Sequence, residues 1–246
     1  MRKHVPPGRP WRTFELVEWD RVFKAFIKVS SICVTGGTGY IGQRLIPLLA
    51  SRGHEIRAVV REESLGKLPN GASIVVADPL KDGSYTEAIK GADTFVHLIG
   101  VPHPSPAKAA QFRAIDLPSA QVAIKAARDA GIRHFVYLSV AQPAPMMKAF
   151  IQVRSEGEAM IRASGMDATF VRPWYVLGPG HRWPYFLLPF YWVAERLPAT
   201  RESARRLGLV TISQMLKALV WVVENPPAGF RILDVPKIRE LSREAM

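Results

Sequence analysis

Three glycines spaced three residues apart are the clearest sign of chemistry in this sequence. They lie in the run Thr35-Gly-Gly-Thr-Gly-Tyr-Ile-Gly42, between a strand-like apolar segment and a segment with helical periodicity. Gly36 would allow a sharp turn, Gly39 would let a ligand approach the backbone, and Gly42 would let the helix pack closely on the sheet. The free N–H groups and the positive dipole end of that helix attract phosphate. The run therefore predicts a dinucleotide site, with contacts expected at Gly36, Thr38, Gly39, Tyr40, Ile41 and Gly42.

The residues at the end of the second expected strand bear on which dinucleotide binds. NAD-selective sites place a carboxylate there to accept hydrogen bonds from the ribose, whereas this chain has Arg61. A guanidinium can bond a 2′-phosphate bidentately, so NADP is predicted over NAD. The acids Glu62 and Glu63 follow directly, so NAD and a solvated surface arginine stay open as alternatives.

Asp78 stands at the end of the third expected strand, just before Pro79. A carboxylate at this position is placed to meet the adenine amino group of a bound dinucleotide. An Asp before a Pro is equally typical of a residue that closes a turn with its own side chain. Both roles stay open from the sequence.

Strand-like and helix-like segments alternate along the chain with short connections, which predicts an α/β fold. Alternation of this kind demands parallel strands joined by right-handed crossovers, giving a doubly wound, Rossmann-type sheet with helices on both faces. Strands are expected over 29–34, 55–60, 73–77, 94–98, 134–138, 168–171 and 230–235, and helices over 41–51, 85–90, 107–130, 150–163 and 212–224.

Three parts are expected along the chain. Residues 1–27 form an extension, either mobile or with a short helix over 14–26 docked on the domain. Residues 28–173 form the dinucleotide-binding domain, and 174–246 form a small pocket or lid region whose helix and strand return to it. The apolar, proline-broken segment 183–194 is too short to span a bilayer. It could bury against the sheet, rest on an anionic membrane, or admit a quinone-like or lipid-like ligand.

Composition narrows the class of protein. The 246 residues are 48% hydrophobic and 22% charged, which is typical of a folded globular protein. The net charge of +12 comes from dispersed Lys and Arg without a nucleic-acid-binding motif, so a basic surface is expected rather than a nucleic-acid site. No metal site is expected. The single Cys33 has no intramolecular partner, which favours a reducing cytoplasm.

Five motifs in order carry a resemblance to a known family. They are the glycine run, His97-Leu-Ile-Gly100, Tyr137-Leu-Ser139, Val171-Arg-Pro173 and Gly178-Pro-Gly180. Over residues 28 to about 235 the chain resembles the short-chain dehydrogenase/reductase superfamily. Within it, the chain looks like the atypical branch of NAD(P)H-binding, NmrA-like proteins and the accessory NADPH-binding subunit of respiratory complex I, which are related to NAD-dependent epimerases and dehydratases. The resemblance also implies cofactor contacts at Leu98 and Pro173.

The same resemblance identifies the candidate catalytic residues. In active relatives a Ser or Thr orients the substrate carbonyl, a Tyr transfers the proton, and a Lys four residues later lowers the pKa of that Tyr and holds the ribose. Ser139 matches the first role, but Phe150 and Arg154 occupy the other two positions. Phenylalanine cannot act as a general acid or base, whereas Arg154 could still bond the ribose. No tyrosine of the chain is followed four residues later by Lys.

Two functions follow as hypotheses. One is an NADP-dependent reductase, epimerase or dehydratase for a small apolar substrate, with another proton source in the pocket; the candidates are His97, His103, Lys148 and Tyr175. The other is a non-catalytic NADP(H)-binding protein, a redox sensor or an accessory subunit, which would need a protein partner.

Overall fold

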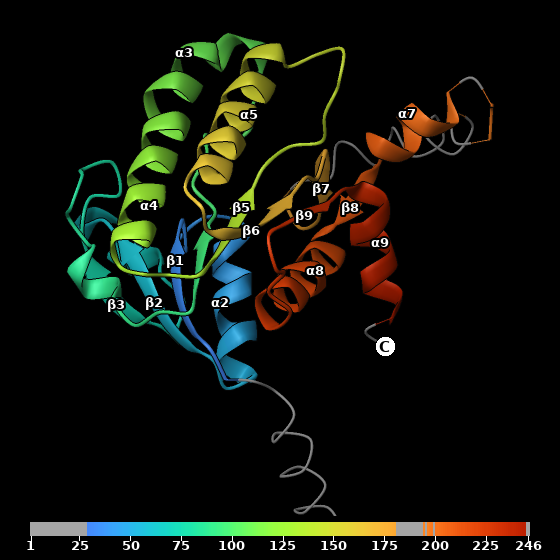
Figure 1. The fold of residues 1–246 in the computed structure, drawn as a ribbon. Coiled ribbons are helices and arrows are strands. Elements are labelled where there is room, and N and C mark those ends of the chain that lie inside the picture. Colours follow the sequence, from blue (N-terminus) through green and yellow to red (C-terminus); the bar gives the residue numbers. More distant parts are fainter. Residues whose placement is uncertain (1–28, 181–193, 195, 199, 245–246) are drawn as a thin grey trace, which may run out of the picture.

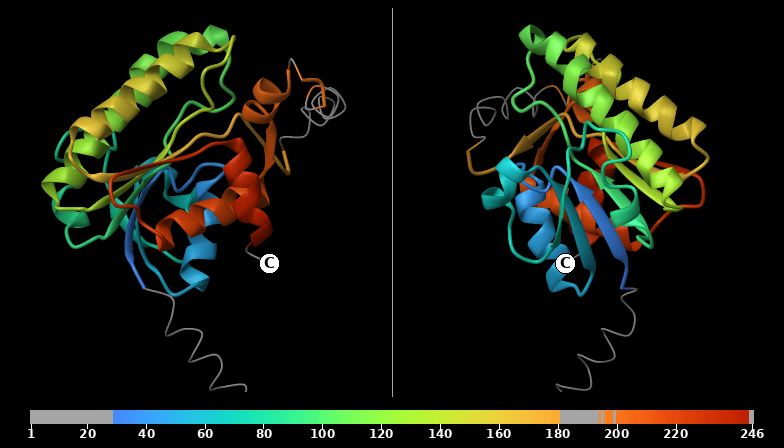
Figure 2. Two further views of the ribbon diagram at one scale, coloured as in Figure 1. Left: turned by 45° about the vertical axis from the view of Figure 1, so that its right-hand side comes forward. Right: turned by 90° about the vertical axis from the view of Figure 1, so that its left-hand side faces the viewer.

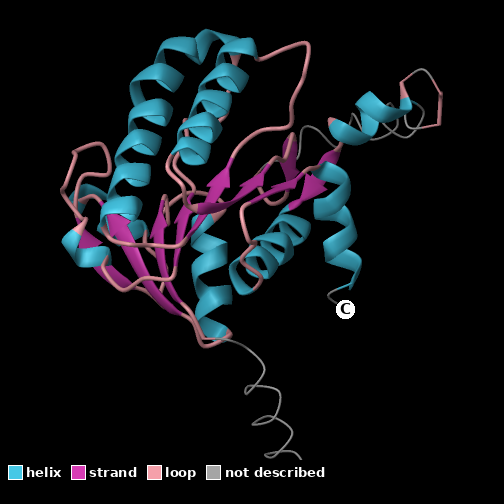
Figure 3. Ribbon diagram, in the orientation of Figure 1, coloured by secondary structure: helices cyan, strands magenta, loops and turns pink. Residues whose placement is uncertain are grey.

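A sheet of seven parallel strands organises the part of the chain that the computed structural model describes, residues 29–180, 194, 196–198 and 200–244. The spatial order is β3-β2-β1-β4-β5-β6-β9 (Figure 1, Figure 3). The strands are β1 Ser31–Thr35, β2 Glu55–Val60, β3 Ser73–Val76, β4 Thr94–His97, β5 His134–Leu138, β6 Asp167–Val171 and β9 Phe230–Leu233. Each neighbouring pair is parallel, so the predicted doubly wound sheet is confirmed.

Helices cover both faces of this sheet (Figure 1, Figure 2). On one face lie α4 (Leu117–Asp129) and α5 (Lys148–Ala163), and on the other lie α2 (Gly42–Ser51) and α8 (Ile212–Glu224). Every residue of β4 is buried, as expected of a central parallel strand that packs against both helix layers. Two apolar clusters result, one on each face.

The C-terminal part contributes to the main sheet and also forms a small one of its own. Strands β7 (Tyr175–Leu177) and β8 (Leu209–Thr211) pair in parallel, and α7 (Arg201–Arg206) lies between them in the chain. A capping box starts α8, because the Thr211 hydroxyl accepts from the Gln214 amide at 3.1 Å while the Gln214 side chain accepts from the Thr211 amide at 2.9 Å. The chain then returns as β9 and ends in α9 (Val235–Glu244).

The prediction of one continuous helix over 107–130 is wrong. The structure has a 3₁₀ turn η3 (Pro106–Lys108), a short α3 (Ala109–Gln111), a π-helical stretch η4 (Phe112–Asp116) and then α4. Pro118 lies in the first turn of α4 and has no N–H to continue a regular ladder from the preceding residues. Asp116, the last residue of the π-helical stretch, is fully buried.

Smaller departures have local causes. The helix expected over 85–90 is only a 3₁₀ turn η2 (Glu87–Ile89), held between Gly83 and Gly91, which both have positive φ. A 3₁₀ helix η1 (Glu62–Lys67) follows β2, and α5 begins at Lys148 rather than at Phe150. The expected segment 14–26 and residues 183–193 of the expected segment 183–194 lie outside the described residues. Across the described ranges, none of the helices has the length and apolar character that crossing a bilayer requires.

Candidate functional site

The glycine loop lies where β1 ends and α2 begins, beside β4. Gly36 has a φ of +77°, and a Cβ there would lie 2.8 Å from the carbonyl carbon of Leu98 and 2.9 Å from the amide of Ile99. A side chain at Gly42 would overlap the carbonyl oxygen of Gly36. Only glycine fits these two positions, because the turn and the helix are packed backbone against backbone.

The start of α2 is suited to an anion. Its N-cap, Ile41, has no side-chain hydrogen bond to the helix, and its first turn holds no acidic residue. The first amides of a helix have no intrahelical acceptor, and the helix dipole favours negative charge there. The loop also lies at the carboxyl ends of β1 and β4, where the strand order reverses and open α/β sheets bind ligands. The residues present therefore fit a dinucleotide pyrophosphate.

The residues expected to select the nucleotide lie at the ends of β2 and β3. Arg61 is exposed and pairs with Glu63 at 3.0 Å. Asp78 is exposed, and its carboxylate accepts a hydrogen bond from the Leu80 amide at 2.9 Å. The turn-closing role of Asp78 is thus present in the structure, while its contact with adenine and the phosphate contact of Arg61 stay predictions.

Arg154 occupies the position of the family lysine, and its guanidinium is bonded to groups of the protein itself. Its guanidinium forms an ion pair with Asp116 at 2.9 Å, and the two side chains are 4% and 0% exposed. It also donates to the carbonyl of Leu138 at 2.9 Å and to that of Ile99 at 3.2 Å. These bonds tie α5 to the ends of β4 and β5. A ribose could share Arg154 only by competing with these partners, so the predicted ribose contact stays a prediction that this arrangement does not favour.

Asp116 completes this cluster from the π-helical stretch. Its other carboxylate oxygen accepts from the Val101 amide at 2.8 Å. Burial raises the pKa of Asp116 above its ordinary value, and the Arg154 guanidinium acts in the opposite direction. Among the described residues, Arg154 is the cation that compensates a charged Asp116 for its loss of water.

Phe150 lies where the family has its tyrosine. Its ring centroid is 4.9 Å from that of Phe112, and it packs against a small apolar cluster with Val101 and Val153. The Arg154 guanidinium carbon lies 5.2 Å from the centroid of the same ring. Phe150 therefore has an evident packing role and no group that transfers a proton.

Ser139 belongs to a buried polar cluster with Glu158, Arg172 and Gln142. The Ser139 hydroxyl donates to Glu158 at 2.6 Å, and the Gln142 amide donates to the same oxygen at 3.2 Å. Arg172 donates its Nε to Glu158 at 2.8 Å and bonds the second carboxylate oxygen through a terminal nitrogen. As arranged, the proton of the Ser139 hydroxyl is directed to Glu158 rather than to a substrate.

The four candidate proton sources lie in different surroundings. His97 is fully buried, its Nδ1 lies 2.8 Å from the Thr35 hydroxyl, and burial lowers its pKa to about 3. It is a neutral core residue at neutral pH. Tyr175 is half-buried, and burial raises its pKa. His103 and Lys148 are exposed.

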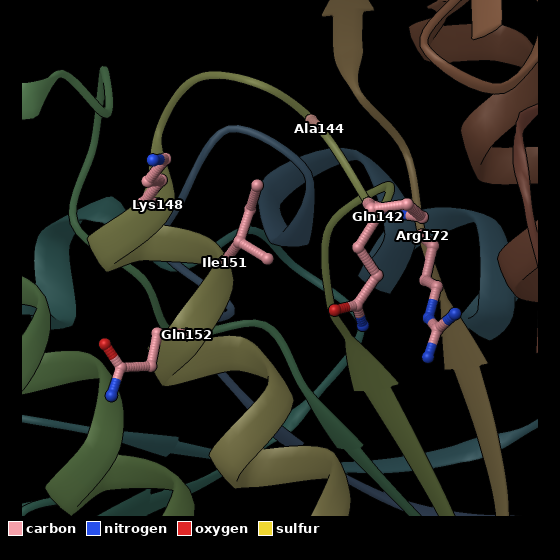
Figure 4. Close-up of a pocket in the computed structure, with 7 residues that line it drawn as sticks. Gln142, Ala144, Lys148, Ile151, Gln152 and Arg172 are labelled. Atoms are coloured by element: carbon pink, nitrogen blue, oxygen red, sulfur yellow. The ribbon is translucent and has the colours of Figure 1, made fainter.

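A cavity of about 550 Å³, wide open to solvent, lies beside the Ser139 cluster, between the start of α5 and the loop that follows β5 (Figure 4). Its lining residues are Gln142, Pro143, Ala144, Lys148, Ile151, Gln152 and Arg172. Gln142 and Arg172 reach both the cavity and Glu158. Of the four candidate proton sources, Lys148 is the one that lines this cavity.

The sequence analysis missed Asp116 and Glu158. Phe150, Arg154 and Glu158 are spaced by four, so they share one face of α5, and that spacing was a usable signal for Glu158. Asp116 left no such signal, because it meets Arg154 across 38 positions of sequence.

With this geometry in place, comparison with known proteins defines the class. A model of the NAD(P)H-binding family matches residues 36–181. The chain belongs to the NAD(P)H-binding family, within the atypical short-chain dehydrogenase/reductase superfamily. The predicted family is thus confirmed, and so is a nicotinamide dinucleotide as the cofactor.

Two curated relatives show the range of the family. Ceramide reductase of Caulobacter vibrioides is 26% identical over 200 residues, which cover 80% of this chain and 62% of that protein. The uncharacterized sugar epimerase YhfK of Bacillus subtilis is 32% identical over 154 residues, covering 58% of this chain and 70% of that protein. The chain therefore spans less than two thirds of ceramide reductase, and it spans 20% of the dihydroflavonol 4-reductase of Arabidopsis thaliana.

Solved structures share the fold. WbmH of Bordetella bronchiseptica, in complex with NAD+, has a TM-score of 0.63 at 19% identity, covering 88% of this chain and 80% of its own. A UDP-glucose 4-epimerase of Thermotoga maritima, with UDP-glucose, has a TM-score of 0.62 at 15% identity, covering 87% and 82%. At these identities the likeness shows the fold alone.

Proposed function

We propose that this protein binds NADP(H) at its glycine loop without the tyrosine-dependent hydride transfer of its enzymatic relatives, and that it serves as a redox-state sensor or an accessory subunit of a larger complex. The observation that supports this is the burial of Arg154 against Asp116, at 4% and 0% side-chain exposure. The lysine position of the family relay is occupied by a structural ion pair.

The chemistry of the relay explains the proposal. A bound nicotinamide accepts or supplies a hydride, and the protein must handle the accompanying proton. Phe150 has no proton to give, and the Ser139 hydroxyl already donates to Glu158 at 2.6 Å. Losing a positioned general acid lowers a rate by about 10² to 10⁴. The site keeps what binding needs and lacks what this proton transfer needs.

Calorimetry and turnover together test the proposal. The protein is titrated with NADPH and NADH, and the sample that binds is then assayed for NADPH oxidation with quinones, enones and nucleotide sugars. Binding without turnover is expected. Steady turnover by the native protein, with no gain in the double variant Phe150→Tyr/Arg154→Lys, would refute the proposal. Co-purification from the native host would identify the protein partner that a sensor or accessory subunit requires.

A second function has one specific observation in its favour. Lys148 lines the cavity beside the Ser139 cluster, so a substrate carbonyl held there would have an ammonium group within the same space. In this function the protein is an NADP-dependent reductase, and Lys148 protonates the oxygen as the carbonyl carbon is reduced. Turnover that falls at least about 10²-fold in Lys148→Met and does not recover in Lys148→Arg, whose guanidinium does not release a proton, would support it. Equal kcat in the native protein and in Lys148→Met would refute it.

A further inference from the structure

The cavity at the start of α5 has a charge balance that the dinucleotide does not explain. Among the residues that the structure describes, its lining carries two cations, Lys148 and Arg172, and no carboxylate (Figure 4). Its volume of about 550 Å³ falls in the range of small-molecule sites. The cavity is therefore large enough for a ligand and has an excess of positive charge.

Glu158 compensates only one of these two positive charges, that of Arg172. Glu158 is bonded by Nε of Arg172 and by one of its terminal nitrogens. Lys148 has no hydrogen-bond or ion-pair partner among the residues that the structure describes. One positive charge is left over, which matches a ligand with one negative charge.

The lining holds two neutral amides, and both donate to carboxylates, Gln142 to Glu158 and Gln152 to Glu156. Gln142 donates to Glu158 at 3.2 Å and accepts from the Ser155 hydroxyl at 2.5 Å. Its orientation is therefore set by the protein, and it adds little capacity to bond a second polar group. The charged donors of the lining are cationic, and a carboxylate bonds to them more strongly than a neutral oxygen does.

The backbone around the cavity supports the same assignment. The N-cap of α5, Met147, has a φ of +60° and no side-chain hydrogen bond to the helix, and the first turn holds no acidic residue. The positive end of this 16-residue helix adds to the field of Lys148. Pro143, Ala144 and Ile151 line the rest of the cavity and offer apolar contact.

We propose that this cavity binds a small monocarboxylate with an apolar body, whose charge is met by Lys148. The inference rests on the proposed function in one respect: the ligand is proposed to bind to a protein that also binds NADP(H). It narrows the expected small apolar ligand to an amphiphilic anion.

Ligand-observed NMR on the full chain, with NADPH present and absent, tests the proposal. The probes are matched pairs of an acid and its neutral alcohol, 3-phenylpropanoate with 3-phenylpropanol and hexanoate with hexanol, together with phenyl phosphate. Each acid should bind about tenfold more tightly than its alcohol, because charged hydrogen bonds replace neutral ones. The preference should weaken as salt rises. Equal binding of acid and alcohol, or tighter binding of the phosphate, would overturn the proposal.

Variants of Lys148 test whether the acid binds in this cavity. Lys148→Met should weaken acid binding about three- to fivefold, the small effect expected of a solvent-exposed charge, and should leave alcohol binding unchanged. Lys148→Arg should bind like the native protein, and so should Lys81→Met, which removes an exposed lysine outside the cavity lining. Equal losses in Lys148→Met and Lys81→Met would overturn the assignment. NADPH titration of the same samples keeps the outcomes apart, since a failure to bind NADPH refutes the proposed function alone.

Discussion

The buried pair of Asp116 and Arg154 can be tested through stability. Asp116→Asn removes the charge but keeps an oxygen that can accept from the Val101 amide, which Asp116 now bonds at 2.8 Å. Arg154 then remains 3% exposed without its counter-charge. Removing one partner of a buried pair lowers stability by about 3 to 5 kcal/mol. For a chain of this size, each kcal/mol shifts Tm by about 2 to 4 °C, so the midpoint should fall by at least about 6 °C.

Urea denaturation followed by circular dichroism measures the free energy of unfolding, and thermal melts give Tm. The double variant Asp116→Asn/Arg154→Met should be no less stable than Asp116→Asn alone, because no uncompensated charge remains. Asp129→Asn is the matched control, since Asp129 pairs with Arg128 at the surface and its loss should change little. If Asp116→Asn lowers stability by less than about 1 kcal/mol, the pair is not the structural element that we infer.

Three further predictions concern the cofactor site and acid stability. Gly36→Ala should abolish NADPH binding in calorimetry, because its Cβ would collide with backbone at 2.8 Å. Gly53→Ala is the matched control, because Gly53 has a similar φ but open space around it, so this variant should still bind NADPH. NADPH binding by both variants would contradict the role of the glycine loop. Arg61→Ala should weaken NADPH binding about tenfold and leave NADH unchanged, as expected for a lost charged hydrogen bond to the 2′-phosphate; equal effects on both would remove its role. Burial lowers the pKa of His97 to about 3 and that of His134 to about 4, so only the unfolded state binds these protons between about pH 6.5 and those values. Stability should therefore fall as the pH drops through that window, and His97→Gln should make the fall less steep in urea denaturation at several pH values.

Local patterns explain which predictions succeeded. The strand, glycine run and helix around Gly36 are contiguous, so their meaning could be read from residues within one βα unit. The helix predicted over 212–224 has the same bounds as α8, and the capping box of Thr211 and Gln214 fixes its first turn. The helix over 107–130 was wrong because the disruption at Pro118 propagates backward into a π-helical stretch, which periodicity does not reveal.

The amino-acid sequence alone determined the parallel Rossmann fold, the dinucleotide loop and the absence of a tyrosine at position 150, because each depends on residue types or on spacing within one or two elements. Tertiary structure alone decided what Arg154 does, since its partner Asp116 is 38 residues away and reaches it only after β4, β5 and α5 have packed. It also decided that the Ser139 hydroxyl faces Glu158 and that Lys148 and Arg172 share a cavity. The sequence offers a charged side chain several possible ion-pair partners. Only the packed tertiary structure selects one of them, because it buries that pair and excludes water from it.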